Sequence, residues 1–156
     1  MEDTLLAFRI PAWSGADRAG LMAHPKVFMF DLGVRNALLR RPLRRPLPDE
    51  MGLLLEHFVS YELWRRAGGL MPDARVTHYR SRHGAEVDFV LEMGRDVWGI
   101  EVKASRTVRP AQLSGLASLA ERRPKLRQLV VFLGPRRLQM GDVEVLPVGE
   151  LLAELA

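Results

Sequence analysis

Apolar and polar positions along the chain follow two patterns, which predict strands and helices in different places. Short apolar runs such as 26–32 (KVFMFDL) and 128–133 (QLVVFL) are typical of buried strands, whereas the apolar stripe within 50–67 predicts a long helix. Asp49 is the expected N-cap of this helix and Gly68-Gly69 its end. Strands are predicted over 4–10, 26–32, 75–80, 85–92, 97–104, 128–133 and 143–146, and helices over 34–40, 50–67, 110–122 and 149–155.

The order of these elements indicates the fold class. From residue 49 onward the predicted order is α-β-β-β-α-β, followed by a further strand and a further helix. This order is typical of an α/β protein of the α+β kind, with a mixed sheet, rather than of a repeated β-α unit. The length of 156 residues suits a domain with a sizeable core.

Two predicted strands form a hairpin around Gly94-Arg95, because a two-residue connection with glycine first fits a type II′ turn. In the register that this turn sets, residues whose numbers sum to 189 lie opposite each other. One face of the hairpin is then apolar and the other largely polar. The apolar pairs are Val87–Val102, Phe89–Ile100 and Leu91–Trp98, and the pairs on the other face are Glu86–Lys103, Asp88–Glu101 and Val90–Gly99.

The hairpin brings two carboxylates, those of Asp88 and Glu101, opposite each other with Cβ atoms about 4.5–5.5 Å apart. Like charges so placed repel, and a divalent cation between them removes the repulsion; Mg²⁺ prefers such oxygen ligands. Lys103 lies on the same face, where its ammonium could meet a phosphate oxygen or a water near the metal. A simpler interpretation is also open, with Glu86–Lys103 as a cross-strand ion pair and one carboxyl protonated.

The amino-acid composition excludes several classes of protein and of site. Apolar residues make up 47% and charged residues 27%, as in ordinary globular proteins, and the absence of cysteine excludes disulfides, thiolate metal sites and cysteine nucleophiles. No apolar run approaches the roughly 20 residues of a membrane span. The apolar stretch from Leu5 is broken by Arg9 and Pro11, unlike a signal peptide. A cytoplasmic protein without membrane association is therefore expected.

Basic residues number 23 against 19 acids, for a net charge of +4, and only three of them are lysines. Twenty arginines make phosphate binding admissible, because guanidinium groups bind phosphate in a bidentate manner; a general arginine bias is the alternative. Segment 40–48 holds three prolines and four arginines, so we expect a loop. That loop is either a phosphate-binding track or a solvated linker.

The spacing of Asp88, twelve intervening residues and then Glu101-Val102-Lys103 resembles the D-x(n)-(D/E)-x-K signature of the PD-(D/E)XK nuclease superfamily. The predicted α-β-β-β-α-β order resembles the core of those restriction-endonuclease-like folds. More narrowly, several segments resemble a domain of unknown function at the C-terminus of many bacterial and archaeal AAA-type ATPases. These segments are 26–33 (KVFMFDLG), 52–63 (GLLLEHFVSYEL), Tyr79-Arg80, 86–90 (EVDFV) and 100–103 (IEVK).

This resemblance implies a domain organisation and a site. Residues 1–24 would be an N-terminal segment similar to the tail of a winged-helix region, and 25–156 the nuclease-like domain. Mg²⁺, or Mn²⁺ in its place, would be the cofactor and DNA the substrate. Asp88, Glu101 and Glu56 would bind the metal, with Glu62 as a second candidate for the helix acid, and Lys103 would assist the attacking water. Contacts with nucleic acid would be made by Arg80, Arg82, Gln112 and Tyr79.

The chain contains no G-x-x-x-x-G-K-[ST] sequence, so an ATPase would act as a partner or belong to a part of the gene product outside this chain. The leading expectation is a Mg²⁺-dependent DNA nuclease. The alternative is a non-catalytic DNA- or protein-binding module of an ATPase assembly that keeps the nuclease fold. A third hypothesis is a homo-oligomerisation domain, a homodimer for example, with Trp13, Trp64 or the first strand exposed to the partner.

Overall fold

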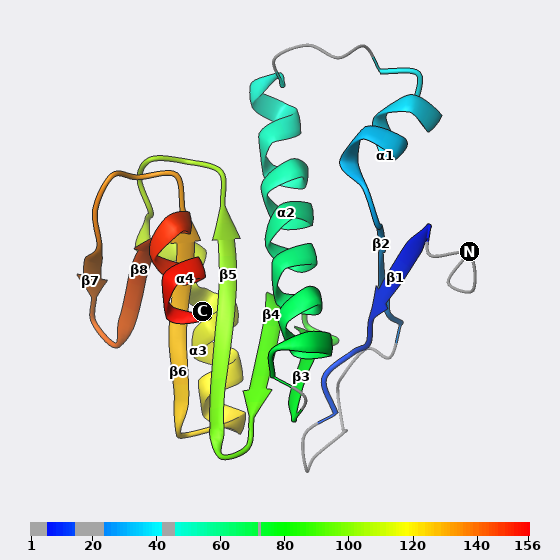
Figure 1. The fold of residues 1–156 in the computed structure, drawn as a ribbon. Coiled ribbons are helices and arrows are strands. Elements are labelled where there is room, and N and C mark those ends of the chain that lie inside the picture. Colours follow the sequence, from blue (N-terminus) through cyan, green and yellow to red (C-terminus); the bar gives the residue numbers. More distant parts are fainter. Residues whose placement is uncertain (1–5, 15–23, 42–45, 72) are drawn as a thin grey trace.

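The computed structural model describes residues 6–14, 24–41, 46–71 and 73–156. Within them the chain forms a two-stranded sheet, a six-stranded sheet and four α-helices (Figure 1). The elements are β1 (Ala7–Ile10), β2 (Lys26–Met29), α1 (Leu32–Leu38), α2 (Pro48–Gly69), β3 (Ala74–Arg80), β4 (Glu86–Met93), β5 (Asp96–Lys103), the 3₁₀ helix η1 (Pro110–Leu113), α3 (Ser114–Arg122), β6 (Leu126–Phe132), β7 (Leu138–Met140), β8 (Val143–Pro147) and α4 (Val148–Glu154).

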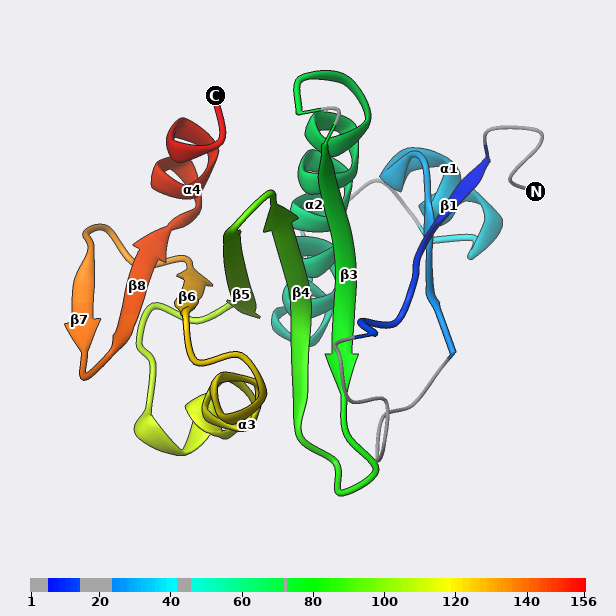
Figure 2. The same cartoon turned by 90° about the horizontal axis from the view of Figure 1, so that it is seen from below.

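The larger sheet has the strand order β3-β4-β5-β6-β8-β7 and is mixed. β3, β4 and β5 are antiparallel neighbours, whereas β6 runs parallel to both β5 and β8. Helices α2 and α4 cover one face and α3 covers the other (Figure 2). The predicted α/β class with a mixed sheet is confirmed, and so is the α-β-β-β-α-β order from α2 to β6. The appended part has two strands rather than one, because the short edge strand β7 follows β6.

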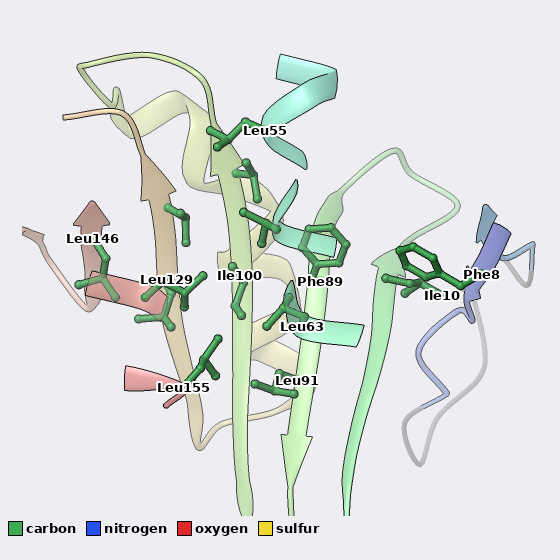
Figure 3. Close-up of a cluster of buried hydrophobic side chains, with 14 residues drawn as sticks. Phe8, Ile10, Leu55, Leu63, Phe89, Leu91, Ile100, Leu129, Leu146 and Leu155 are labelled. Atoms are coloured by element: carbon green, nitrogen blue, oxygen red, sulfur yellow. The ribbon is translucent and has the colours of Figure 1, made fainter. Parts of the chain in front are cut away.

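Each face of the sheet has its own hydrophobic core. On the α2 side, Leu55 and Leu63 pack against Phe89, Leu91 and further strand residues (Figure 3). On the α3 side, the core is built on Leu116 and Leu119, which are 1% and 0% exposed. Burying large aliphatic side chains on both faces is the main favourable contribution to the stability of such a three-layer fold.

The β4–β5 hairpin has the predicted turn and register. Gly94 has a φ of 62°, as the first position of a type II′ turn requires, and Val90 lies opposite Gly99. The predicted apolar face is wrong at Val87, which belongs to the core on the α3 side while Phe89 belongs to the other core. The cause is an irregularity between β3 and β4, where the pairing shifts by one residue and Asp88-Phe89 faces a single residue of β3.

The N-terminal part of the described chain packs beside α2 as a β1–β2 hairpin (Figure 1). β2 ends at Met29 and is only half-buried, so the prediction of a buried strand through residue 32 is wrong. Asp31 ends the extended stretch because its Oδ1 accepts a hydrogen bond from Val34 N at 2.8 Å, which makes it the N-cap of α1. Helix α1 therefore begins at Leu32, earlier than predicted.

Helix α2 differs from the prediction at both ends. Its N-cap is Leu47 rather than Asp49; Pro48 occupies the first helical position and Glu50 Oε2 accepts a hydrogen bond from Leu47 N at 2.8 Å. The helix continues through Gly68 and ends at Gly69, with Leu70 as its C-cap. Residues 42–45, with half of the predicted loop arginines, lie outside the described residues.

Trp13 is buried rather than exposed, with 7% of its surface accessible, and its ring meets Tyr79 edge-on. Trp64 stacks on Phe8 and contacts Phe30. Both tryptophans suggested for an oligomer interface therefore pack against other aromatic side chains of the same chain. Among the described residues, no helix combines the length and apolar character needed to cross a lipid bilayer.

Gly115 should be irreplaceable in α3, because a Cβ there would lie 1.8 Å from the backbone oxygen of Glu86. Gly115→Ala must push α3 off the start of β4, and we expect a loss of about 2–4 kcal/mol in the free energy of unfolding. Gly52→Ala is the matched control, since this exposed helical glycine has nothing within 4 Å of its added Cβ. It should stabilise by about 0.5–1 kcal/mol. Urea denaturation measures both, and equal effects would contradict the close approach.

Candidate functional site

The β4–β5 hairpin opens at the end away from its turn. Backbone pairing is regular from Met93–Asp96 to Phe89–Ile100, and the next residue of β4 is Asp88. Its carboxylate Oδ2 accepts a hydrogen bond from Val102 N at 2.9 Å, in place of a backbone acceptor. The expectation that Asp88 and Glu101 continue the ladder as a backbone pair is therefore wrong in detail. The irregularity in β4 instead turns the Asp88 side chain into the gap between the strands.

Glu101 and Lys103 lie on β5 beside this gap. Lys103 Nζ donates to Glu101 Oε1 at 2.5 Å, while Glu101 Oε2 is buried and has no hydrogen-bond partner among the described residues. Burial, together with the nearby charge of Asp88, raises the pKa of Glu101 to about 7, although Lys103 opposes this shift. Glu101 is thus a buried carboxyl group that titrates near neutral pH and has one unused oxygen.

Glu56 and Lys26 complete the cluster from outside the hairpin. Glu56 projects from α2, and its Oε1 accepts a hydrogen bond from Lys26 Nζ at 2.8 Å. The same ammonium lies 3.2 Å from Asp88 Oδ1 and 3.2 Å from Glu86 Oε1. Burial alone would lower the pKa of Lys26, but Asp88 and Glu56 outweigh it and hold that pKa above its ordinary value. Burial and the charge of Asp88 raise the pKa of Glu56.

These side chains surround one open cleft of about 610 Å³. Its four acids and two lysines carry a formal charge of −2 when all are ionised, which is the charge that one divalent cation neutralises. The cleft is lined by Lys26, Val27, Phe28, Leu53, Glu56, Glu86, Asp88, Glu101 and Lys103.

The donor chemistry of the cleft fits Mg²⁺, which takes one or two carboxylates and completes its shell with water and substrate oxygens. The unpartnered buried oxygen of Glu101 is the observation that supports this fit, because a buried carboxylate oxygen without a partner is unfavourable. Within the described residues, no three acid or histidine side chains are already drawn together as a metal-binding group. A positive charge is instead supplied there by Lys26, whose ammonium lies among three of the acids.

The structure brings Asp88, Glu101, Lys103 and Glu56 to the cleft, as the sequence predicts for a common site. Lys26 had no predicted role there. The one signal for it was its rarity, as one of three lysines in an arginine-rich chain, within a segment that carries the family resemblance. The alternative interpretation, an ion pair of Glu86 with Lys103, is not observed, because Glu86 pairs with Lys26.

The other candidates lie elsewhere. Glu62 pairs with Arg65 and Arg66 on α2 and does not line the cleft. Tyr79 is buried and its hydroxyl contacts Ser118 Oγ at 2.9 Å, so it does not face solvent.

The other three suggested nucleic-acid contacts, Arg80, Arg82 and Gln112, are exposed but are not among the cleft-lining residues. Arg80 ends β3, with its Nε 3.9 Å from Glu86 Oε2, and Arg82 lies in the following turn. Gln112 Oε1 accepts a hydrogen bond from Arg109 N at 2.8 Å and so caps η1.

The fold and the cluster define a mixed α/β domain with a carboxylate–lysine cleft where a β-hairpin opens. The family model "Domain of unknown function (DUF4143)" matches residues 51–151, and the chain belongs to this family. No curated protein gives a significant match. The matched segment includes Glu56, Asp88, Glu101 and Lys103, whereas Lys26 precedes it.

The raised pKa of Glu101 predicts a pH-dependent contribution to stability. Between its ordinary value of 4.5 and about 7, the folded protein holds a proton that the unfolded chain releases, so this contribution is lost as pH rises. Glu101→Gln stays neutral throughout. The free energy of unfolding of Glu101→Gln, relative to that of the wild type, should therefore rise by about 2 kcal/mol from pH 5 to pH 8. Denaturation at several pH values measures this difference.

The control is Glu121→Gln, which removes one negative charge at an exposed position of α3. Parallel pH profiles for the wild type and Glu101→Gln would contradict the assignment of a shifted carboxyl group to position 101.

Proposed function

We propose that this domain is a Mg²⁺-dependent nuclease-like hydrolase that acts on DNA, with Mn²⁺ able to replace Mg²⁺. The observation that supports it best is the meeting of Asp88, Glu101, Lys103 and Glu56 at one cleft, at the point where β4 and β5 separate. Asp88 and Glu101 hold the metal in this proposal, with Glu56 as a third oxygen donor. Lys103 polarises the attacking water.

The chemistry follows from these residue types. A divalent cation bound there supplies Lewis acidity toward the phosphodiester and makes a bound water more acidic. Glu101 keeps Lys103 in place through the 2.5 Å hydrogen bond, so the ammonium is oriented before substrate arrives. Hydrogen bonding to Val102 N fixes one oxygen of Asp88 and leaves Oδ1 directed to the cleft side, where Lys26 contacts it.

DNA as the substrate is supported by charge. The net charge is +4 with twenty arginines, and exposed Arg80 and Arg82 lie beside the start of β4, which carries Glu86 and Asp88. Guanidinium groups there would bind the phosphate backbone next to the cleavage site. By its resemblance to C-terminal domains of AAA-type ATPases, the domain would work with such an ATPase in the cytoplasm.

A second function is favoured by one specific observation, the ion pairs of Lys26 with Glu56, Glu86 and Asp88. An ammonium among the acids compensates their charge without a divalent cation. The domain would then be a non-catalytic DNA- or protein-binding module of an ATPase assembly. It would bind DNA with a steep dependence on salt, and it would take up no Mn²⁺.

The nuclease proposal is tested by metal-dependent nicking of supercoiled plasmid. Asp88→Asn keeps an acceptor for Val102 N but removes the anionic ligand, and we expect nicking to fall by about 100-fold or more. Lys103→Ala should abolish nicking as well while Mn²⁺ binding persists, because the lysine acts on water rather than on the metal.

Asp96→Asn is the matched control, since it makes the same change at the exposed turn end of the same hairpin. It should nick plasmid at the wild-type rate. Nicking that survives in both Asp88→Asn and Lys103→Ala would assign the activity to another site or to a contaminant.

A further inference from the structure

Among the described residues, Lys26 is the cation that contacts acids of both α2 and β4 in the cleft. Its Nζ lies 2.8 Å from Glu56, 3.2 Å from Glu86 and 3.2 Å from Asp88, and its side chain is 20% exposed. The ammonium also lies over the ring of Phe89, 5.8 Å from its centre, which is a cation–π contact. Such an ammonium supplies the positive charge that these carboxylates need when they are brought together.

Lys26 lies on β2, and two histidines, one from α2 and one from β3, bind the backbone near the two ends of this strand. His57 of α2 donates from Nε2 to Met29 O at 2.5 Å, and His78 of β3 donates from Nε2 to His24 O at 2.9 Å. Carbonyl oxygens only accept hydrogen bonds, so each imidazole must present its Nε2–H to the strand. The backbone that carries Lys26 is therefore held by the fold, and a displacement of the ammonium would be a movement of the side chain.

The ammonium and a divalent cation compete for the same oxygen. The hydrogen bond from Val102 N holds Asp88 Oδ2 toward the backbone of β5, whereas Oδ1 is the oxygen that Lys26 contacts in the cleft. Mg²⁺ binds carboxylate oxygen at about 2.0–2.1 Å. A dication at that distance from Oδ1, with the ammonium still at 3.2 Å from it, would place two like charges close together in a half-buried cleft.

We propose that Lys26 is the resident counter-cation of this carboxylate cluster and that a divalent cation binds there only by displacing its ammonium. The proposal rests on the proposed function, because it takes the metal site as given and assigns Lys26 a role in it. Withdrawal of Lys26 changes the formal charge that faces the metal from −2 to −3. Occupancy of the site is thereby coupled to the contacts of β2, which lies far from the hairpin in sequence.

Acylation of lysine side chains tests the displacement in the unaltered protein. The sequence has three lysines, so peptide mapping by mass spectrometry after brief treatment with acetic anhydride reports each one separately. We expect Mn²⁺ to increase the acylation rate of Lys26 by about fivefold or more, because the ammonium is then released from three carboxylates. Exposed Lys125 is the internal control and should not change. A Lys26 rate that stays constant or falls while Mn²⁺ is bound would overturn the proposal.

Mn²⁺ affinity, measured by electron paramagnetic resonance of the free ion, provides the second test. Lys26→Gln should bind Mn²⁺ about tenfold more tightly than the wild type because the competing charge is gone. Lys125→Gln removes the same charge at an exposed position and should leave the affinity unchanged. Equal or weaker binding by Lys26→Gln would overturn the displacement and leave the metal site of the proposed function intact.

Absence of Mn²⁺ binding in the wild type, Lys26→Gln and Lys125→Gln would overturn the metal-dependent function together with the displacement. The two failures are thus distinguishable. The acylation measurement needs no variant, so its result stands even where Lys26→Gln does not fold.

Discussion

The hydrogen bond from Val102 N to the Asp88 carboxylate is the contact on which the cleft depends. It satisfies a backbone donor at the point where β4 and β5 stop pairing, so the strands can separate without leaving that N–H group unbonded. The same bond fixes an acid in the opening. The irregularity opposite β3 makes this possible, because it places Phe89 in one core and Val87 in the other while Asp88 turns between the strands.

The buried charges of the cleft compensate one another within a small space. Glu101 is opposed by Lys103, and three further acids share Lys26, which keeps each carboxylate close to a cation. Removing either partner from such a pair costs more than the pair contributes, since it leaves a desolvated charge behind. This balance also explains why the pKa values of Glu56 and Glu101 are both raised: burial and the shared neighbour Asp88 act on them more strongly than the lysines do.

Local sequence patterns were enough to predict most of the elements and the mixed sheet. They also predicted the register of the central hairpin from its turn to Phe89–Ile100, because a two-residue turn at Gly94 and alternating apolar residues determine it together. The same patterns predicted that Asp88, Glu101 and Lys103 lie close together on one face of this hairpin. They did not predict the shift between β3 and β4, which depends on the pairing of two strands and leaves no mark in a single strand. Nor did they predict Lys26, which reaches the cleft from a separate hairpin through tertiary packing alone.

The N-terminal hairpin lies outside the residues that the family model matches. The DUF4143 match begins at residue 51, whereas β1, β2 and Ala12, which forms a bridge with His78 at the edge of β3, all precede it. A fragment trimmed to the matched residues would retain every acid of the cleft and lose the ammonium that neutralises three of them. It would also uncover Phe89 and the outer edge of β3, an unpaired strand edge of the kind that promotes association between molecules. A fragment chosen from the family match alone would therefore lack contacts that complete the cleft.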